Sequence, residues 1–268
     1  MSSDSEESLW EADGQSTAFI RRKDKMESEA DHRIHKRFTA LYGLTSGLGI
    51  LLIVLMLTWI VRYQNGFGVS DADKEFNWHP MLMVLGLIFT YAQSMLVYRT
   101  GRHAKKKLLK ITHAVLHCLA FILTVIALKA AFDSHNYSVP PKPNLYTLHS
   151  WVGLIAVILF AYQFLSGFIS FLYPGLSKEM RKTYLPVHTS FGSGIYTLVI
   201  VAAMMGIGEK AIWSVTDYNK ASAEAILVNF MGVVLVSFGV LALYLVHDPT
   251  YKRIALAEDE INLPSRID

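Results

Sequence analysis

Six long apolar stretches dominate the chain, and short polar segments separate them. Each stretch approaches or exceeds the roughly 20 residues that a helix needs to cross the hydrocarbon core of a bilayer. The predicted spans are Phe38–Val61, Pro80–Val97, Leu108–Phe132, Leu148–Leu172, Val187–Ile207 and Ala223–Val246. The pattern therefore predicts an all-α membrane protein with six transmembrane helices, placed in the lipid bilayer.

The polar segments at the two ends predict two tails beside a membrane domain. Residues 1–37 begin with an acidic stretch among Ser and Gly, which is typical of a mostly disordered tail. No cleavable secretory signal is visible before the first span, so we expect that span to act as the targeting anchor. Residues 38–247 are predicted to form the transmembrane domain, and residues 248–268 a second tail.

Composition supports the membrane assignment and excludes several other classes. The chain is 52% hydrophobic and only 18% charged, which is too apolar for an ordinary soluble domain of 268 residues. The single cysteine, Cys118, excludes an intrachain disulfide, a cysteine-based zinc site and a covalently attached c-type haem. The net charge of +3 is small, and the basic residues cluster beside the spans, so no nucleic-acid partner is expected.

The distribution of basic residues predicts the topology. Of the 25 Lys and Arg residues, most lie in the N-terminal segment, the connections after the second and fourth spans, and the C-terminal tail. The other three connections carry only two each. Because Lys and Arg near helix ends favour the cytoplasm, both termini are predicted to be cytoplasmic.

Four of the ten histidines lie at the leading ends of consecutive spans: His79, His113, His149 and His188. Successive helices run in opposite directions, so these histidines alternate between the two membrane faces. We call His79 and His149 the outer pair, and His113 and His188 the inner pair, on the cytoplasmic side. Helices two apart in an up-down bundle lie across its centre from each other. Spans two to five are therefore predicted to form a four-helix bundle in which each pair meets at one depth.

Two facing imidazoles at one depth suit the two axial positions of a planar iron porphyrin, so the arrangement predicts two haems. Small residues near the histidines, Gly86, Gly153, Ala156 and Gly192, would leave room for a flat macrocycle. Such residues also pack transmembrane helices together and carry little weight alone. His117 lies one turn deeper than His113 on the same face, and depth alone does not firmly decide which of the two binds iron.

A histidine-lined metal or proton transporter is the alternative that remains open. A first-row metal site would more naturally include carboxylates or thiolates, and a proton relay usually needs buried carboxylates. The middle parts of the predicted spans contain no Asp or Glu. Because ionisable groups at membrane depth are costly and usually functional, the four histidines favour a cofactor over simple packing.

Three short strings, in this order and spacing, resemble the cytochrome b561 family of transmembrane ascorbate-dependent oxidoreductases. They are "LVYR" (Leu96–Arg99), "HAVLH" (His113–His117) and "LHSW" (Leu148–Trp151), and the resemblance covers about residues 40–250. It implies two haems b per chain, the outer one between His79 and His149 and the inner one between His113 and His188, in a homodimer. It selects His113 over His117 as the ligand, and we expect His117 to support the inner haem without binding its iron.

The resemblance also implies a reaction and two substrate sites. Cytoplasmic ascorbate would reduce the inner haem, and electrons would pass through the outer haem to monodehydroascorbate or ferric iron. The chain offers cations for the ascorbate anion, although positive-inside anchoring explains most of them equally well; these are Arg99, Lys106, Lys107, Lys110 and Arg181. His135 and Tyr146 match the outer acceptor site, and an interfacial aromatic belt explains Tyr146 equally well. Secretory-vesicle, endolysosomal and plasma membranes all remain open as locations.

Overall fold

The structure, a computed structural model, describes residues 3–253, with the side chains of residues 22, 23 and 25–253. The α-helices are α1 (Ser3–Tyr63), α2 (Ala72–Phe76), α3 (Trp78–Met83), α4 (Tyr91–Thr100), α5 (Lys106–Asn136), α6 (Leu148–Phe171), α7 (Lys178–Ser214) and α8 (Ala223–His247). A π-helix, η1 (Val84–Thr90), joins α3 to α4, and two short 3₁₀ turns are η2 (Tyr218–Lys220) and η3 (Pro249–Tyr251). Residues 3–253 contain no β-strand.

The chain divides into two compact units, one ending at Gly43 and the other beginning at Leu44. α1 begins at Ser3, so residues 3–37 are helical where the sequence predicted a mostly disordered tail. Glu, Ala, Lys and Arg, which favour helix, are frequent in this segment. The cytoplasmic placement of both tails stays a prediction, and residues 254–268 of the predicted C-terminal tail lie outside the described residues.

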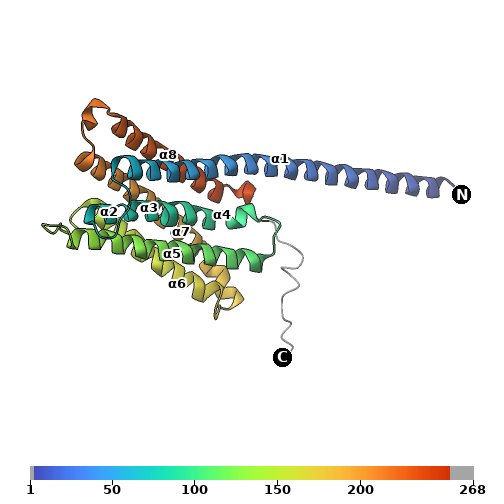
Figure 1. The fold of residues 1–268 in the computed structure, drawn as a ribbon. Helices are drawn as coiled ribbons and strands as arrows, with labels where there is room; N and C mark the ends of the chain where they lie inside the picture. The colour runs from blue at the N-terminus through green and yellow to red at the C-terminus, as the bar shows by residue number, and fades with distance from the viewer. Residues whose placement is uncertain (1–2, 254–268) are drawn as a thin grey trace. The chain divides into compact units, whose positions relative to one another are not determined.

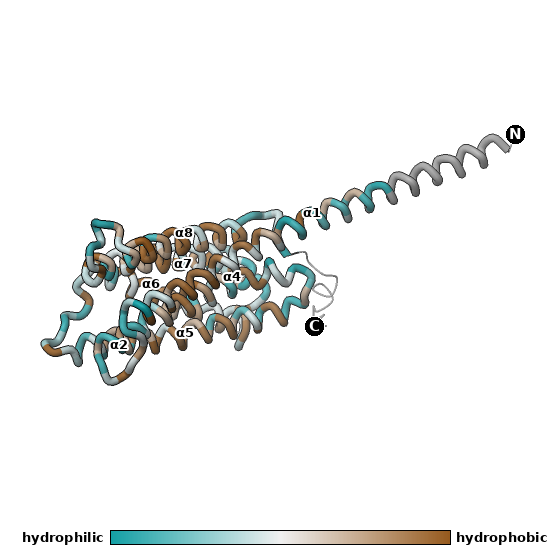
Figure 2. Tube along the Cα trace, turned by 45° about the horizontal axis from the view of Figure 1, so that its top comes forward, coloured by the Kyte–Doolittle hydropathy of each residue, from teal (hydrophilic) through white to brown (hydrophobic). Residues whose placement is uncertain are grey.

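Among the described residues, six helical segments are long and apolar enough to cross a membrane. They are Lys25–Tyr63, Ala72–Thr100, Lys106–Asn136, Leu148–Phe171, Lys178–Ser214 and Ala223–His247. Each predicted span lies within one of these segments, except that the fourth predicted span ends one residue after the end of α6. The chain is therefore a multi-pass helical membrane protein. Figure 2 shows hydrophobic residues along the helices and hydrophilic residues gathered near the connections.

The second to fifth spans close into a four-helix bundle, as predicted. α5 packs along α3, η1 and α4, which together make the second span, and also along α6. α7 packs along α6 and closes the ring by contacting η1. α8 packs on α7 and α4 from outside this ring, and Figure 1 shows α5 and α6 running side by side within it.

Short polar side chains fix where several helices begin. Thr147 and Ser150 form a capping box at the start of α6, two residues before His149. Ser177 caps α7 by accepting a hydrogen bond from the Met180 N–H, and Ser222 caps α8 in the same way. These caps pair N–H groups that a helix start would otherwise leave without partners.

The π-helix η1 changes the rotation of the second span between its two ends. Twelve residues separate His79 from Tyr91, and at about 100° per residue an uninterrupted α-helix would place them about 120° apart. The wider π turn absorbs an extra residue and reduces this angle to roughly 20°. The Thr90 hydroxyl donates to the Leu85 carbonyl oxygen across this turn (2.7 Å). Both His79 and Tyr91 can therefore face the interior of the bundle.

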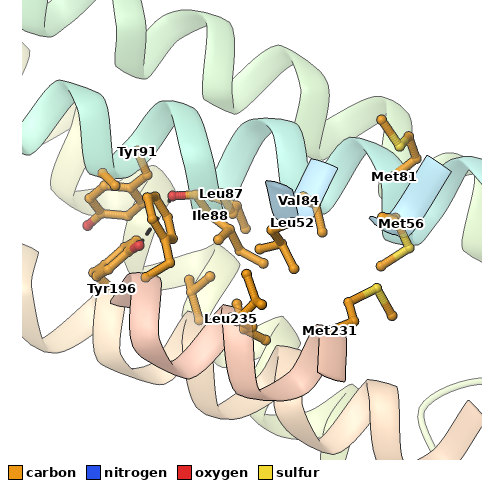
Figure 3. Close-up of a cluster of buried hydrophobic side chains, with 14 of the residues drawn as sticks. Leu52, Met56, Met81, Val84, Leu87, Ile88, Tyr91, Tyr196, Met231 and Leu235 are labelled. Atoms are coloured by element: carbon orange, nitrogen blue, oxygen red, sulfur yellow. Dashed lines mark hydrogen bonds between the residues drawn. The ribbon is translucent and has the colours of Figure 1, made fainter. Parts of the chain in front are cut away.

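A buried apolar cluster joins the second span to α7, α8 and the part of α1 after Gly43. Figure 3 shows Met56, Met81 and Met231 at one end of this cluster, and Tyr91 and Tyr196 at the other. The Tyr91 hydroxyl donates to the Gly192 carbonyl oxygen of α7 (3.0 Å), and the Tyr196 hydroxyl donates to the Ile88 carbonyl oxygen of η1 (3.3 Å). These two reciprocal hydrogen bonds hold η1 and the start of α4 against α7.

Candidate functional site

The outer pair consists of His79 on α3 and His149 on α6, whose ring centres lie 6.2 Å apart. The Nδ1 atom of His79 lies 3.2 Å from the Ala127 carbonyl oxygen, and that of His149 lies 2.7 Å from the Ala202 carbonyl oxygen. A carbonyl oxygen can only accept, so each Nδ1 carries the proton and each Nε2 keeps its lone pair. A lone pair on Nε2 is what binding to a metal requires.

The inner pair has nearly the same geometry. His113 on α5 and His188 on α7 have ring centres 6.3 Å apart. His113 donates from Nδ1 to the Ser94 carbonyl oxygen at 2.8 Å, while the Nδ1 of His188 lies 3.0 Å from the Gln163 side-chain nitrogen. The structure thus brings together the two pairs that the sequence predicted, each drawn from helices on opposite sides of the bundle.

These ring separations fit one metal ion between each pair. Two metal–imidazole bonds of about 2 Å each, placed in line between the rings, put the two ring centres about 6 Å apart. The observed separations of 6.2 and 6.3 Å match this value. Within the described residues, no three His, Cys, Asp or Glu side chains gather around one metal position. The donor set therefore fits a two-ligand axial site, and it does not fit a site built from protein ligands alone.

Two glycines give two of the paired histidines their space. A Cβ atom at Gly206 would lie 2.7 Å from Cε1 of His149, and one at Gly167 would lie 2.7 Å from Cε1 of His188. Such contacts are too close for either ring to keep its position. Each pair therefore has a glycine on the helix that faces one of its histidines, and the close approach of α6 and α7 depends on both glycines.

The small residues singled out from the sequence have different neighbours. Gly153 and Ala156 line the cavity around the outer pair. A Cβ at Gly86 would lie 3.1 Å from the Ala120 carbonyl oxygen, so Gly86 serves the packing of η1 on α5. Gly192 lies beside the Gln163 side chain, where an added Cβ would be 3.3 Å from the amide nitrogen.

A largely apolar cavity of about 220 Å³ surrounds the outer pair. His135 and Tyr146, the predicted outer-site residues, both line it. The Nδ1 atom of His135 lies 3.1 Å from the Asn144 side-chain oxygen, and the Phe76 ring stacks parallel to the His135 imidazole with the ring centres 6.1 Å apart. Tyr146 stacks on Trp213 at 6.2 Å. The cavity therefore runs from the outer histidines to a rim of aromatic and polar side chains.

His117 lies on the inner pair's side of the Tyr91 ring. Its ring centre is 4.5 Å from that of His113 and 4.8 Å from that of Tyr91, with edge-to-face geometry in both contacts. Its side chain is only 8% exposed, and its Nδ1 has no hydrogen-bond partner among the described residues. His117 therefore lies beside His113 but is not one of the two facing histidines of the inner pair. The sequence placed it one turn deeper than His113 on the same face, which agrees with this position.

The predicted ascorbate-binding cations have different surroundings. Lys110 donates from Nζ to the Phe171 carbonyl oxygen (3.2 Å), and the Phe171 ring lies 5.2 Å from that of His188. Arg181 and Lys106 lie close enough to Lys110 to interact with it electrostatically. Lys107 is exposed on the first turn of α5.

Arg99 takes part in a different contact. Its guanidinium donates to the Val246 carbonyl oxygen and, at 2.9 Å, to the Asp248 carbonyl oxygen. These bonds tie the end of α4 to the end of α8. Three of the five predicted cations therefore converge near the inner pair, while Arg99 carries a helix-joining contact.

Several residues that contact the paired histidines were not predicted from the sequence, among them Ser94, Gln163, Gly167 and Gly206. Ser94 and Gln163 had a visible signal, because both are polar residues inside apolar spans, where such residues are costly and usually functional. The two glycines had no such signal. Several other glycines share these spans, and only the helix rotation shows which ones face a histidine.

Comparison with known proteins identifies the family. The profile of eukaryotic cytochrome b561 matches residues 78–214, a range that contains all four paired histidines. The chain is 36% identical over 235 residues to a putative transmembrane ascorbate-dependent reductase CYB561 homolog of Caenorhabditis elegans, covering 84% of this chain and 88% of that protein.

Two further relatives carry names that specify a membrane. The plasma membrane ascorbate-dependent reductase CYBRD1 of Xenopus laevis is 40% identical over 223 residues, which are 82% of this chain and 78% of that protein. The human lysosomal membrane ascorbate-dependent ferrireductase CYB561A3 is 38% identical over 223 residues, covering 81% and 91% of the two chains. The chain therefore belongs to the eukaryotic cytochrome b561 family.

Proposed function

We propose that this protein is a transmembrane oxidoreductase that carries single electrons from cytoplasmic ascorbate, through two haems b, to an acceptor on the other side. The observation that carries the proposal is the presence of two facing histidine pairs with ring centres 6.2 and 6.3 Å apart. The relatives' names, which describe ascorbate-dependent reductases, support the same reaction class. Monodehydroascorbate and ferric iron are the two proposed acceptors.

Haem b, when bound at each pair, supplies a centre that takes up and releases one electron without changing its ligands. His79 and His149 would hold the outer group, and His113 and His188 the inner one. Their Nδ1 contacts with neighbouring helices orient the rings before any cofactor arrives. Because each pair would supply two imidazole ligands to one iron, no coordination position would stay open for oxygen.

The inner pair is proposed to face the cytoplasm. The basic connections after the second and fourth spans adjoin His113 and His188, and the positive-inside rule places such connections in the cytoplasm. Lys106, Lys110 and Arg181 converge there. Ascorbate is an anion at neutral pH, so these cations would raise its local concentration and hold it beside the inner pair. The Lys110 contact with Phe171, whose ring packs on His188, joins the proposed substrate site to the ligand.

The cavity around the outer pair is proposed to admit the acceptor from the opposite side. His135, Asn144 and Tyr146 lie at its rim and offer hydrogen-bonding groups to a small polar molecule. We further propose a homodimer in which each chain holds its own pair of haems. Its membrane would be that of a secretory vesicle, an endolysosome or the cell surface.

The haem content of the purified protein tests this proposal. The detergent-solubilised chain should be red, show a bis-imidazole b-type spectrum that changes on reduction, and contain about two haems per chain. His79→Ala and His149→Ala should each remove the outer haem and leave the inner haem. His113→Ala and His188→Ala should each remove the inner haem and leave the outer haem. A correctly folded but colourless protein, as a metal or proton transporter would be, contradicts the proposal.

A further inference from the structure

The four paired histidines differ in what holds their Nδ1 atoms. In the outer pair, both Nδ1 atoms face main-chain carbonyl oxygens, those of Ala127 and Ala202. In the inner pair, each histidine also contacts a polar side chain. The Ser94 hydroxyl donates to the His113 carbonyl oxygen (2.9 Å) and lies 3.2 Å from His113 Nδ1, which also has the Ser94 carbonyl oxygen as a main-chain acceptor at 2.8 Å. For His188, the contact at Nδ1 comes from the Gln163 side chain.

Gln163 is built into the wall around His188. Its side chain, only 8% exposed, places the amide nitrogen 3.0 Å from His188 Nδ1 and 2.6 Å from the His188 carbonyl oxygen. Gly192 leaves room for this amide, and Gly167, one turn further along α6, leaves room for the imidazole. Gln163 is thus held against the Nδ1 edge of the ring, opposite the nitrogen that would bind iron.

Binding of a metal by His188 would determine what its Nδ1 atom must contact. A neutral imidazole that binds a metal through Nε2 carries its proton on Nδ1, and that N–H needs an acceptor. With the amide nitrogen facing it, Nδ1 would instead have to accept, and the proton would then occupy Nε2. A half turn of the amide exchanges its nitrogen for its oxygen with little change in shape. The same half turn gives up the bond to the His188 carbonyl oxygen, now 2.6 Å long, so the amide must also shift away from that oxygen because two acceptors repel each other. The carbonyl lies inside α7 and retains the helix's own hydrogen bond.

We propose that Gln163 is a positioning residue that sets the tautomer of His188 through its side-chain amide and thereby tunes the inner site separately from the outer one. The inference rests on the proposed binding of haem at the inner pair. His79, His113 and His149 receive their acceptors from the main chain, so side-chain substitution does not remove those acceptors. Only His188 would lose the acceptor at its Nδ1 atom through a single side-chain substitution, that of Gln163.

The test compares Gln163→Leu and Gln163→Glu with the wild-type protein. Both variants are titrated potentiometrically in the haem-loaded state, and electron paramagnetic resonance assigns the two low-spin centres. Gln163→Leu removes the acceptor, which weakens electron donation from the imidazole and favours the reduced state. We expect its inner couple to shift upward by about tenfold in the reduction equilibrium, or about 59 mV for one electron. Gln163→Glu offers a stronger acceptor, so its inner couple should shift downward. The outer couple should not move in either variant.

Two control variants separate this role from general packing. Ser94→Ala also removes a side-chain contact from an inner ligand but leaves the main-chain acceptor of His113, so its shift should be much smaller. Thr124→Val removes a buried hydrogen bond to the Ala120 carbonyl oxygen within α5, which involves none of the four histidines, and should move neither couple.

Selective loss of the inner haem in Gln163→Leu, with its retention in Gln163→Glu, would also support the proposal. Four outcomes overturn it: no shift in either variant, equal shifts of both couples, a downward inner shift in Gln163→Leu, or loss of the inner haem in both variants. A wild-type protein that binds no haem would instead contradict the proposed function. The two failures are therefore distinguishable.

Discussion

Gly206 and Gly167 are the residues at which a single methyl group would reach a paired histidine. A Cβ at either position would lie 2.7 Å from the imidazole it faces, and overpacking of this kind costs about 1–3 kcal/mol. We expect Gly206→Ala to displace His149 and lower the occupancy of the outer haem alone. Gly167→Ala should displace His188 and lower the occupancy of the inner haem alone. Haem content per chain and the redox titration of the remaining centre measure both effects.

Gly208 is the matched control for this prediction. It lies two residues from Gly206 on the same helix, and no atom lies within 4 Å of the position its Cβ would take. Gly208→Ala should therefore keep both haems. Equal loss of the two haems in Gly206→Ala and Gly167→Ala would show that these glycines serve the packing of α6 on α7 rather than one histidine each.

Lys110 is the cation that we propose to hold ascorbate most directly. Its ammonium reaches the carbonyl oxygen of Phe171 beside His188, with Lys106 and Arg181 close by. Because a hydrogen bond to a charged group contributes about 1.5–3 kcal/mol, we expect Lys110→Gln to raise the KM for ascorbate roughly tenfold or more. Stopped-flow reduction of the oxidised protein by ascorbate, at low and high salt, measures this change.

Charge-matched variants make the Lys110 prediction specific. Lys110→Arg keeps the charge and should recover most of the activity. Lys129, which pairs with Asp133 at the opposite end of α5, provides a control for the loss of one positive charge elsewhere. An equal effect of Lys129→Gln would mean that overall charge, and not a site beside the inner pair, controls the reaction with ascorbate.

At the scale of an element, the π-helix η1 fixes the rotation of the second span. Deleting Leu85 would remove the extra residue, so η1 could become α-helical while the angle between His79 and Tyr91 stays at about 20°. Deleting both Val84 and Leu85 would instead turn the two ends of this span by about 100° relative to each other. Because Tyr91 and Ser94 hold the inner end against α7 and α5, we expect the outer end to turn in the double deletion and His79 to leave its pair. The double deletion should lose the outer haem and keep the inner haem.

The haem content of the two deletion variants tests this expectation, with the single deletion of Leu85 as the control for loss of the π turn without a change in rotation. The single deletion should keep both haems. A double deletion that binds two haems with unchanged spectra would show that the rotation of the second span does not set the position of His79.

The same element shows what the sequence can and cannot predict. Hydropathy located all six spans, and the alternation of His79, His113, His149 and His188 located both pairs, because each depends only on length and spacing. The π turn in "VLGLIFT" has no hydropathy signal, because the hydropathy of this mainly apolar segment is the same whether it forms an α-helix or a π-helix. Its effect on rotation therefore appears only in the structure. The contacts of Gln163, Gly167 and Gly206 with the histidines depend on rotation in the same way.

At the scale of the whole molecule, the two histidine pairs divide the bundle into an outer and an inner half. Tyr91 and Tyr196 pack edge to face at 5.3 Å and join the start of α4 to α7, while His117 lies against the Tyr91 ring near the inner pair. Ring systems therefore extend from the inner pair toward the core between η1 and α7. This arrangement gives the molecule a direction, because anion-attracting side chains lie beside the inner pair and the apolar cavity surrounds the outer pair.

That direction predicts how a single-site variant behaves in a sealed vesicle. In His149→Ala, the inner pair and the Lys110 site are intact, so ascorbate on the cytoplasmic face should still reduce the remaining haem. Transfer to ferricyanide on the opposite face should fall at least tenfold, because the outer site is lost. The measurement uses proteoliposomes of known orientation, with ascorbate on one face and ferricyanide on the other. In His188→Ala, ascorbate on the cytoplasmic face should no longer reduce the remaining haem rapidly. If cytoplasmic ascorbate reduced the single haem equally fast in both variants, the inner pair would not be the entry point for electrons.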